Sequence, residues 1–328
     1  MKELAFTLII LFISCQTNNK NEVKRTIGSI EQLKPEMSKF ISIDNEIEIL
    51  AEGFEWSEGP VWVNELNAIL FSDVPSNKIY KWDESNGLKV FMEPSGYTGV
   101  VPNNTKKGSN GLVINEEGQL VLCMVGDRRV SRLSDFFEKK FIPIITNFKG
   151  NLFNSPNDLV YAENGDLFFT DPPGGLLKKD DDELKELPFN GVFKLTKSGV
   201  LSLVIKNLTR PNGIGISKDQ KTLYVSNSDP NNPIIMSYEI LPDGVKNPKV
   251  FFDGKELSKK YIGNFDGLKV HPSGAIFSTG PGGVLIISKD GEHLGTIKTS
   301  ERTSNCNFDN DYNYLYMTTD MYLTRVKL

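Results

Sequence analysis

Residues 154–175 read N-S-P-N-D-L-V-Y-A-E-N-G-D-L-F-F-T-D-P-P-G-G, and this stretch decides the fold class. Two apolar runs, 159–161 and 167–170, are separated by a polar turn that contains Asn-Gly. Asn-Gly between apolar runs is the strongest short-range indication of a β-hairpin. The stretch therefore predicts two antiparallel strands, with the polar residues Asn157 and Asp158 at the mouth of the hairpin.

The same order of elements recurs along the chain: a polar residue, an apolar strand, a turn and a second apolar strand. The residues that lead the six copies, spaced by 52, 47, 55, 54 and 39 residues, are Glu58, Asn110, Asn157, Asn212, Asp266 and Asn305. Repeats of about 40 to 50 residues that contain only strands and turns are typical of propeller blades. We therefore predict an all-β fold, a six-bladed β-propeller over residues 46–328. The strand predicted at 47–51 should pair with the last blade and close the ring.

The start of the chain has the character of an export signal. An apolar run of eleven residues, 4–14, ends at Cys15. Such a run is too short to span a bilayer, which takes about 20 residues, but suits the apolar region of a signal peptide. Its end, Phe-Ile-Ser-Cys, resembles a bacterial lipobox, in which the Cys is lipidated and becomes the mature N-terminus. We predict a lipoprotein signal peptide over residues 1–15, with a secretory signal cleaved near Ser14 as the alternative.

The residues after this signal bear on where the protein is located. Gln16 follows the Cys, and by resemblance to lipoprotein sorting the absence of Asp there indicates the outer membrane, on its periplasmic side. Residues 16–45 are rich in Asn, Lys, Glu and Ser, which predicts a flexible polar tether. The lipid on Cys15 is then the only expected contact with a membrane.

Composition narrows the classes of partner and chemistry. A net charge of −5 and a pI of about 5.4 argue against a nucleic-acid surface. The sequence has only two histidines and lacks the Gly-x-Ser-x-Gly, Walker and zinc-finger patterns. Cys123 and Cys306 fall in different blades and are expected to be buried free thiols. The polar residues that lead the repeats are therefore the remaining candidates for a functional site.

In a propeller, the innermost strand of each blade lines the central channel, so residues at the starts of these strands converge from separate blades. Two carboxylates and two carboxamides would meet there, from Glu58, Asp266, Asn157 and Asn212. This set suits Ca²⁺, which takes about six to eight oxygen ligands, whereas Zn²⁺ would require His or Cys. The alternative is that these residues only begin each strand with a capping turn.

Several segments carry a family resemblance: Glu58-Gly-Pro-Val-Trp, Ser95-Gly-Tyr-Thr-Gly, Gly108-Ser-Asn-Gly-Leu, Asn154-Ser-Pro-Asn-Asp-Leu, Phe169-Thr-Asp-Pro-Pro, Arg210-Pro-Asn-Gly, Phe265-Asp-Gly-Leu, Ser278-Thr-Gly-Pro-Gly-Gly-Val and Thr303-Ser-Asn-Cys. Together they resemble the SMP-30/gluconolactonase-like (regucalcin-type) lactonases, in particular the bacterial gluconolactonase branch. The resemblance covers the chain from about residue 50 onward. It implies a six-bladed propeller with one divalent ion in the channel, and hydrolysis of a small-molecule sugar lactone.

The resemblance also implies roles for particular residues. The metal, Ca²⁺ first and Zn²⁺, Mn²⁺ or Mg²⁺ as substitutes in vitro, would be held by Glu58, Asn157, Asn212 and Asp266. Asp266 would also be the general base and acid that moves protons between water and the departing alkoxide. Asn110, Arg128 and Asn157 would contact the substrate.

One segment departs from the family pattern. Cys123-Met-Val-Gly-Asp-Arg-Arg is similar to the branch's Cys-x-His-Gly-Asn/Asp-Arg-Arg, but Val125 stands where the branch has His. If that His contacts the substrate or moves protons, this chain has lost the role or acts on another substrate. Two other functions therefore remain open: a metal-dependent esterase or phosphotriesterase on the same site, and a non-catalytic binding propeller with a structural calcium.

Overall fold

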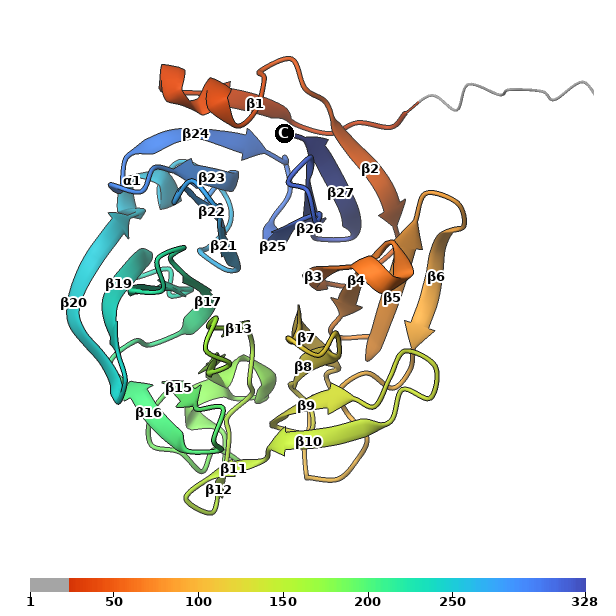
Figure 1. Ribbon diagram of the computed structural model, residues 1–328, viewed down its shortest axis with the longest axis vertical. Helices are drawn as coiled ribbons and strands as arrows, with labels where there is room; N and C mark the ends of the chain where they lie inside the picture. Colours follow the sequence, from red (N-terminus) through yellow and green to blue (C-terminus); the bar gives the residue numbers. More distant parts are fainter. Residues whose placement is uncertain (1–23) are drawn as a thin grey trace, which may run out of the picture.

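The hairpin predicted within residues 154–175 forms the inner half of one blade. In the computed structural model, which describes residues 24–328, β13 (Leu159–Tyr161) pairs antiparallel with β14 (Leu167–Asp171). Residues 1–23, which include Cys15 and the predicted signal peptide, lie outside the described residues. Six such sheets surround a common axis, as Figure 1 shows. The predicted all-β, six-bladed propeller is confirmed.

Each blade is an antiparallel sheet whose first strand lies at the axis. Blade 1 contains β3 (Ser57–Val63), β4 (Ala68–Asp73), β5 (Lys78–Asp83) and β6 (Gly87–Met92), and blade 2 contains β7 (Ser109–Ile114), β8 (Leu120–Met124), β9 (Arg129–Leu133) and β10 (Phe141–Ile145). Blade 3 adds β15 (Gly191–Leu195) and β16 (Leu201–Ile205) to its hairpin, and blade 4 contains β17 (Pro211–Ile216), β18 (Thr222–Asn227), β19 (Ile234–Leu241) and β20 (Gly244–Asp253). Blade 5 contains β21 (Leu268–Val270), β22 (Ile276–Gly280), β23 (Gly283–Ile287) and β24 (His293–Lys298), and blade 6 contains β25 (Thr303–Phe308), β26 (Tyr314–Thr319) and β27 (Tyr322–Lys327). A separate small hairpin is formed by β11 (Asn147–Phe148) and β12 (Asn151–Leu152).

The ring closes between the two ends of the described chain. β2 (Ile47–Glu52) pairs antiparallel with β27, with Ile47 opposite Val326, and becomes the outer strand of blade 6. The predicted pairing of residues 47–51 with the last blade is confirmed. This closure covers an edge that would otherwise be left open on the last blade.

The segment from residue 24 to residue 45 is not a flexible tether, so the prediction for 16–45 is wrong from residue 24 onward. β1 (Ser29–Gln32) pairs with β24 as a fifth strand of blade 5. The side chains of Met37 and Ile41 are buried in the core cluster that blades 5 and 6 share. The polar composition is misleading here, because a few apolar residues are enough to fix this segment. We call residues 24–45 the N-terminal strap.

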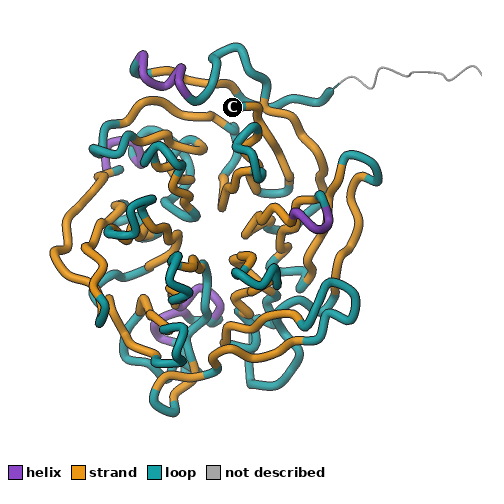
Figure 2. The backbone as a smooth tube through the Cα atoms, in the orientation of Figure 1, coloured by secondary structure: helices purple, strands orange, loops and turns teal. Residues whose placement is uncertain are grey.

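Helices are few and short, as Figure 2 shows. They are α1 (Lys255–Ser258) and the 3-10 turns η1 (Pro35–Lys39), η2 (Asn64–Leu66), η3 (Pro173–Gly175) and η4 (Lys179–Asp181). Within residues 24–328, no helix combines the length and apolar character needed to cross a membrane.

The hydrophobic core lies between blades. Val61 and Leu70 of blade 1, for example, share a buried cluster with Leu112 and Leu122 of blade 2. Each sheet is therefore apolar on both faces, and neighbouring sheets bury each other's faces. Cys123 and Cys306 are buried, free thiols in two such clusters, as expected.

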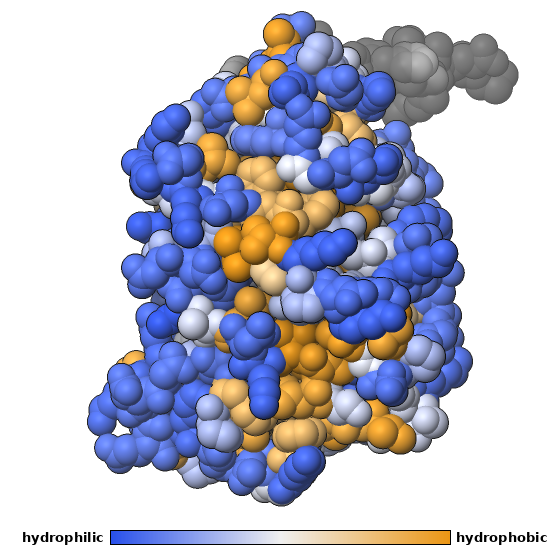
Figure 3. All heavy atoms as spheres, turned by 90° about the vertical axis from the view of Figure 1, so that its left-hand side faces the viewer, coloured by the Kyte–Doolittle hydropathy of each residue, from blue (hydrophilic) through white to orange (hydrophobic). Residues whose placement is uncertain are grey.

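Polar groups are distributed differently around the axis and on the outside. The flank that carries β20 shows apolar surface interspersed with polar groups in Figure 3, and Val250 of this outer strand is 56% exposed. Near the axis the reverse holds, because the starts of the inner strands carry buried polar residues, among them Glu58, Asn110, Asp158 and Asn305. Buried polar groups need partners, so this inner ring is where a ligand site is expected.

Candidate metal centre in the channel

Four inner strands carry the predicted ligands at or just before their first residues. Glu58 and Asn212 are the second residues of β3 and β17, and Asn157 and Asp266 stand two residues before β13 and β21. The pairing of β3 with β4 and of β17 with β18 shifts register beside the ligand, which marks a β-bulge. Bulges bend a strand and redirect a side chain, and they occur often next to functional sites.

Backbone hydrogen bonds between neighbouring blades hold these residues at one level. The Gly111 amide of blade 2 donates to the carbonyl oxygen of Asn157 in blade 3 at 2.7 Å. The Gly213 amide of blade 4 donates to the carbonyl oxygen of Asp266 in blade 5 at 3.0 Å. The start of one inner strand is therefore tied to the start of the next.

The equivalent hydrogen bond between blades 5 and 6 shows which residue of the sixth repeat occupies the leading position. The Gly267 amide of blade 5 donates to the carbonyl oxygen of Ser304 at 2.7 Å. Ser304, and not Asn305, is therefore the residue that leads blade 6. The prediction for Asn305 is wrong by one residue, because the sixth repeat lacks the glycine that marks the position after the leading residue in most blades.

Three carboxamide and carboxylate oxygens of this ring are buried without a hydrogen-bond partner among residues 24–328. They are Oδ1 of Asn110, Oδ1 of Asn212 and Oδ1 of Asp266. A buried oxygen left without a donor costs about 1–3 kcal/mol, and such groups are rare in native proteins. Their presence on three different blades, at the predicted position, fits a cation between them.

The carboxylates of the ring strongly affect one another. Burial raises the pKa of Glu58 to about 7; the Gly59 amide, which donates to Glu58 Oε2 at 3.0 Å, opposes this rise, and the charge of Asp158 adds to it. Burial also raises the pKa of Asp266 well above its usual range, with further contributions from Glu58 and Asp158. A divalent cation would relieve this repulsion and favour the ionised carboxylates.

The donor set decides which ions the centre can hold. Within residues 24–328, no three His, Cys, Asp or Glu side chains converge as a metal-binding group. A metal bound here would therefore need the carboxamides of Asn157 and Asn212 as well as the carboxylates of Glu58 and Asp266. Neutral and anionic oxygens are ligands for hard ions such as Ca²⁺, and they suit Zn²⁺ less well.

Arg128, predicted as a substrate contact, is enclosed in the wall between blades 2 and 3. Its side chain is 1% exposed, its Nε donates to the carbonyl oxygen of Phe153 at 2.6 Å, and its Nη1 lies 3.6 Å from Glu186 Oε1. Its Nη2 has no hydrogen-bond partner among residues 24–328. The structure therefore shows no hydrogen bond from Arg128 to the other predicted site residues in the described part of the chain.

Val125, which replaces the expected His, is buried in the turn between β8 and β9. A Cβ added to Gly175 would lie 2.4 Å from Val125 Cγ1 and 2.5 Å from the Cβ of Ser155. Val125 thus packs tightly against blade 3. Its neighbour there, Ser155, precedes Asn157 by two residues.

Two acidic residues flank the predicted ligand Asn157, and they differ in role. Asp171 accepts the amides of Asn154 at 2.8 Å and Ser155 at 2.7 Å, so it holds the turn in place. Asp158 accepts the Leu159 amide at 2.9 Å, but its other oxygen lies 3.7 Å from Nζ of Lys269. The sequence analysis missed Lys269, although a lysine inside the otherwise apolar strand β21 was a usable signal.

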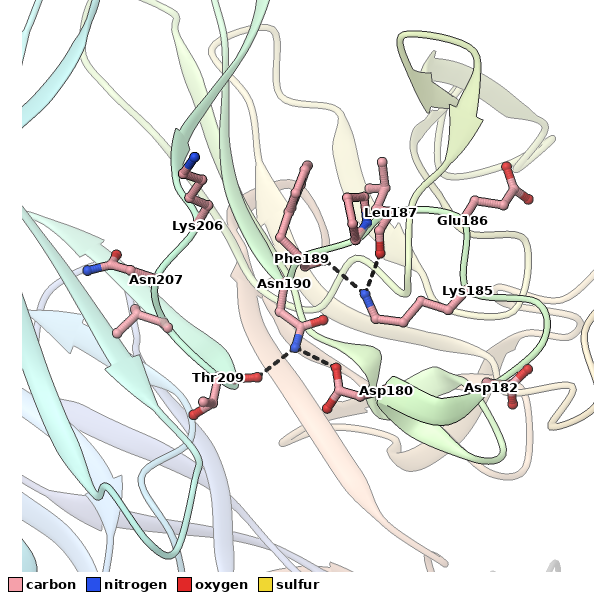
Figure 4. Close-up of a pocket in the computed structure, with 12 residues that line it drawn as sticks. Asp180, Asp182, Lys185, Glu186, Leu187, Phe189, Asn190, Lys206, Asn207 and Thr209 are labelled. Carbon is pink, nitrogen blue, oxygen red and sulfur yellow. Dashed lines mark hydrogen bonds between the residues drawn. The ribbon is translucent and has the colours of Figure 1, made fainter.

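A second cavity, outside the channel, is lined by polar side chains that already form hydrogen bonds within the protein. Loops of blades 3 and 4 line a pocket of about 570 Å³, shown in Figure 4. Nζ of Lys185 donates to the carbonyl oxygen of Phe189 at 3.0 Å, and Nδ2 of Asn190 donates to Asp180 Oδ1 and to the Thr209 carbonyl oxygen, each at 2.8 Å. These side chains differ from the channel oxygens of Asn110, Asn212 and Asp266, which have no hydrogen-bond partner among residues 24–328.

Fold and site together define a six-bladed propeller with an oxygen-rich centre in its channel. Residues 56–321 match the family described as SMP-30/Gluconolactonase/LRE-like region, and the chain belongs to this family. It is 35% identical to a gluconolactonase of Zymomonas mobilis over 323 residues, which cover 96% of this chain and 90% of that protein. The family resemblance seen in the sequence is confirmed.

Two solved structures illustrate the likeness of fold. A gluconolactonase of Xanthomonas campestris matches with a TM-score of 0.80 and 25% identity, over 93% of this chain and 97% of that one. A calcium-binding protein, regucalcin, of Agrobacterium tumefaciens matches with a TM-score of 0.66 and 16% identity, over 85% of this chain and 92% of that one. The second likeness concerns the fold alone.

Proposed function

We propose that this chain hydrolyses a sugar lactone, with one divalent cation held by Glu58, Asn157, Asn212 and Asp266. The observation that carries the proposal is the set of buried oxygens that lack donors within residues 24–328, including those of Asn212 and Asp266, together with the buried carboxylate of Glu58. The similarity to the Zymomonas mobilis gluconolactonase over nearly the whole chain supports the choice of a lactone. Ca²⁺ is the first candidate ion, ahead of Zn²⁺, Mn²⁺ and Mg²⁺, because the donors are all oxygens.

The ion would supply polarisation of the lactone carbonyl and stabilisation of the developing oxyanion. Asp266 takes a proton from the attacking water as its oxygen bonds to the carbonyl carbon. The ring C–O bond then breaks, and Asp266 returns the proton to the departing alkoxide, which leaves a hydroxy acid. We propose that Asn110, whose buried Oδ1 lacks a partner among residues 24–328, contacts the substrate. Lactones are activated esters, so one carboxylate suffices as the base.

The test is steady-state hydrolysis of D-glucono-1,5-lactone, followed by pH-stat, with the chelated protein and with each of the four ions restored. We expect turnover that disappears with chelator and returns most fully with Ca²⁺. Metal binding without turnover of any lactone or ester would contradict the enzyme and favour a binding propeller.

A second substrate class is favoured by one residue. Val125 stands where the family branch has His, and it is buried against blade 3. A phosphotriester or another ester could use the same ion, because the ion would polarise P=O as it does C=O. Turnover of a paraoxon-type ester that exceeds turnover of every lactone in a panel would establish this alternative.

We also propose that the protein is exported and held on the periplasmic side of the outer membrane by lipid on Cys15. The support is the apolar run over residues 4–14 and the lipobox-like end at Cys15. Export would place the enzyme where extracellular or periplasmic sugar lactones reach it.

A further inference from the structure

Each blade has a leading residue at the start of its inner strand, and the residue directly after it is not the same in every blade. This difference affects the shape of the channel. The residue after the leading one is glycine in four blades, Asp158 in blade 3 and Asn305 in blade 6. A Cβ added to Gly267 would lie 2.1 Å from Cγ of Asn305, and one added to Gly111 would lie 2.8 Å from Oδ1 of Asp158. These two glycines therefore leave the room that the two longer side chains fill.

Asp158 and Asn305 come from opposite blades of the ring, as Figure 1 shows, and they meet at the axis. Nδ2 of Asn305 donates to Oδ2 of Asp158 at 3.5 Å. Lys269 of blade 5 joins them: its Nζ lies 3.7 Å from Asp158 Oδ2 and donates to Asn305 Oδ1 at 3.3 Å and to the Leu268 carbonyl oxygen at 3.1 Å. We call Asp158, Lys269 and Asn305 the channel cluster.

One member of the channel cluster, Lys269, also lines a cavity further along the inner strands. This cavity, of about 340 Å³, is lined by later residues of those strands, among them Trp62, Leu112 and Ile216, and by the side chain of Lys269. Lys269 is 21% exposed, whereas Asp158 is 2% exposed. Lys269 therefore both lines this cavity and pairs with the buried carboxylate of Asp158.

The charges near the axis then decide how many ions the channel can hold. Three buried carboxylates belong to the inner strands there, Glu58, Asp158 and Asp266, and the ammonium group of Lys269 lies 3.7 Å from Oδ2 of Asp158. With the three carboxylates ionised, the form that a bound divalent cation favours, and with Lys269 protonated, the net charge is −2, which one divalent ion balances. Charge interactions in a buried site are strong, so this balance matters for affinity.

We propose that Lys269 is a built-in cation of the channel, which neutralises Asp158 and so limits the centre to a single divalent ion of moderate affinity. This inference rests on the metal centre of the proposed function. Lys269 acts as a positioning residue: it holds Asp158 and Asn305 across the axis and does not itself contact the substrate.

Isothermal titration of the chelated full-length protein with Ca²⁺, together with metal counting by mass spectrometry, tests the proposal. Asp158→Asn removes one negative charge and should weaken Ca²⁺ binding by about tenfold or more. Lys269→Met removes the positive charge and should tighten binding by about tenfold or raise the count from one ion to two. The double variant restores the net charge of −2 and should return to within about threefold of the wild-type affinity.

The matched control is the buried ion pair of Lys194 and Asp166, 2.9 Å apart and away from the channel. Lys194→Met and Asp166→Asn should leave Ca²⁺ affinity unchanged. If Lys269→Met does not fold, the double variant still decides, because it leaves no buried charge unpaired. A double variant as weak as Asp158→Asn, or a folded Lys269→Met with unchanged or weaker affinity, overturns the role of Lys269. A wild-type chain that binds no divalent ion overturns the metal centre itself.

Discussion

The amide of Gly213 donates a hydrogen bond of 3.0 Å to the carbonyl oxygen of Asp266, and this bond links blade 4 to blade 5 at the candidate metal centre. The two backbones are so close that a Cβ on Gly213 would lie 2.2 Å from that carbonyl oxygen. Because Asn212 and Asp266 are both predicted ligands, the contact fixes the spacing of two residues of the candidate centre.

Gly213→Ala should therefore damage both stability and metal binding. The added methyl group must push β17 away from Asp266, and we expect a loss of about 1–3 kcal/mol in the free energy of unfolding together with weaker Ca²⁺ binding. Urea denaturation and calorimetric titration measure the two effects. Gly174→Ala is the control, because a Cβ there meets nothing within 4 Å. Equal behaviour of the two variants would contradict the argument.

Glu58→Gln tests whether the leading residues bind metal or only cap strands. The substitution keeps the shape of the side chain but removes one of the two anionic ligands, so Ca²⁺ affinity should fall by about tenfold or more while the propeller stays folded. Metal content by mass spectrometry and circular dichroism provide the two readouts, and exposed Glu65→Gln of the same blade is the control. Unchanged affinity in Glu58→Gln would mean that these residues are strand caps.

Asp266→Asn separates the role of ligand from that of base. The carboxamide retains an oxygen for the ion but cannot accept a proton at neutral pH. At saturating metal, kcat should fall by about 10²- to 10⁴-fold. Asp171→Asn is the comparison: it loses one of two accepted backbone amides and should cost about 1–3 kcal/mol of stability with little effect on kcat. A collapse of kcat in Asp171→Asn with near-normal kcat in Asp266→Asn would place the base on the blade 3 hairpin.

Met37→Ala tests the N-terminal strap. Met37 is fully buried, and a Cβ on Gly295 would lie 2.0 Å from its sulfur, so the fit is tight. We expect a loss of about 2–5 kcal/mol in the free energy of unfolding. Exposed Glu36→Ala, the preceding residue, should change stability little. If residues 24–45 behaved as a flexible tether in solution, both variants would unfold at the same urea concentration as the wild type.

Cys15→Ser tests the export proposal. If Cys15 is lipidated, the substitution should abolish labelling by a radioactive fatty acid and leave the chain soluble or unprocessed. Labelling that survives the change would refute the lipoprotein assignment. An unlabelled wild type cleaved before residue 25 would instead indicate a plain secreted protein.

Much of the fold could be predicted from local patterns. The hairpin pattern within residues 154–175 and its five further copies along the chain are short-range signals. They allow the blades and the leading residues Glu58, Asn157, Asn212 and Asp266 to be found without a structure. The closure of the ring by residues 47–51 followed from the short last repeat. These features depend on residues close together in the sequence, where turn chemistry and alternation are readable.

Other features depended on long-range contacts and could not be predicted. The channel cluster joins Asp158, Lys269 and Asn305, which lie far apart in the sequence, so no local pattern revealed it. The repeat pattern alone predicts Asn305 instead of Ser304 as the leading residue of blade 6. A shift of one residue becomes visible only from the backbone hydrogen bond between Gly267 and Ser304. The polar composition of the N-terminal strap predicts a tether, because only a few of its residues make apolar contacts.

The N-terminal strap has a mechanical consequence for a chain tethered at its start. A pull on residue 24 acts first on β2, through the ion pairs of Lys24 with Glu48 and of Arg25 with Glu52, and only then on the pairing of β1 with β24. The Ile49 amide also donates to the carbonyl oxygen of Arg25, and the Ile27 amide donates to that of Ile47, so tension on the strap passes directly to the strand that closes the ring. An anchor at Cys15, if the export proposal holds, would therefore load the closure of the propeller itself.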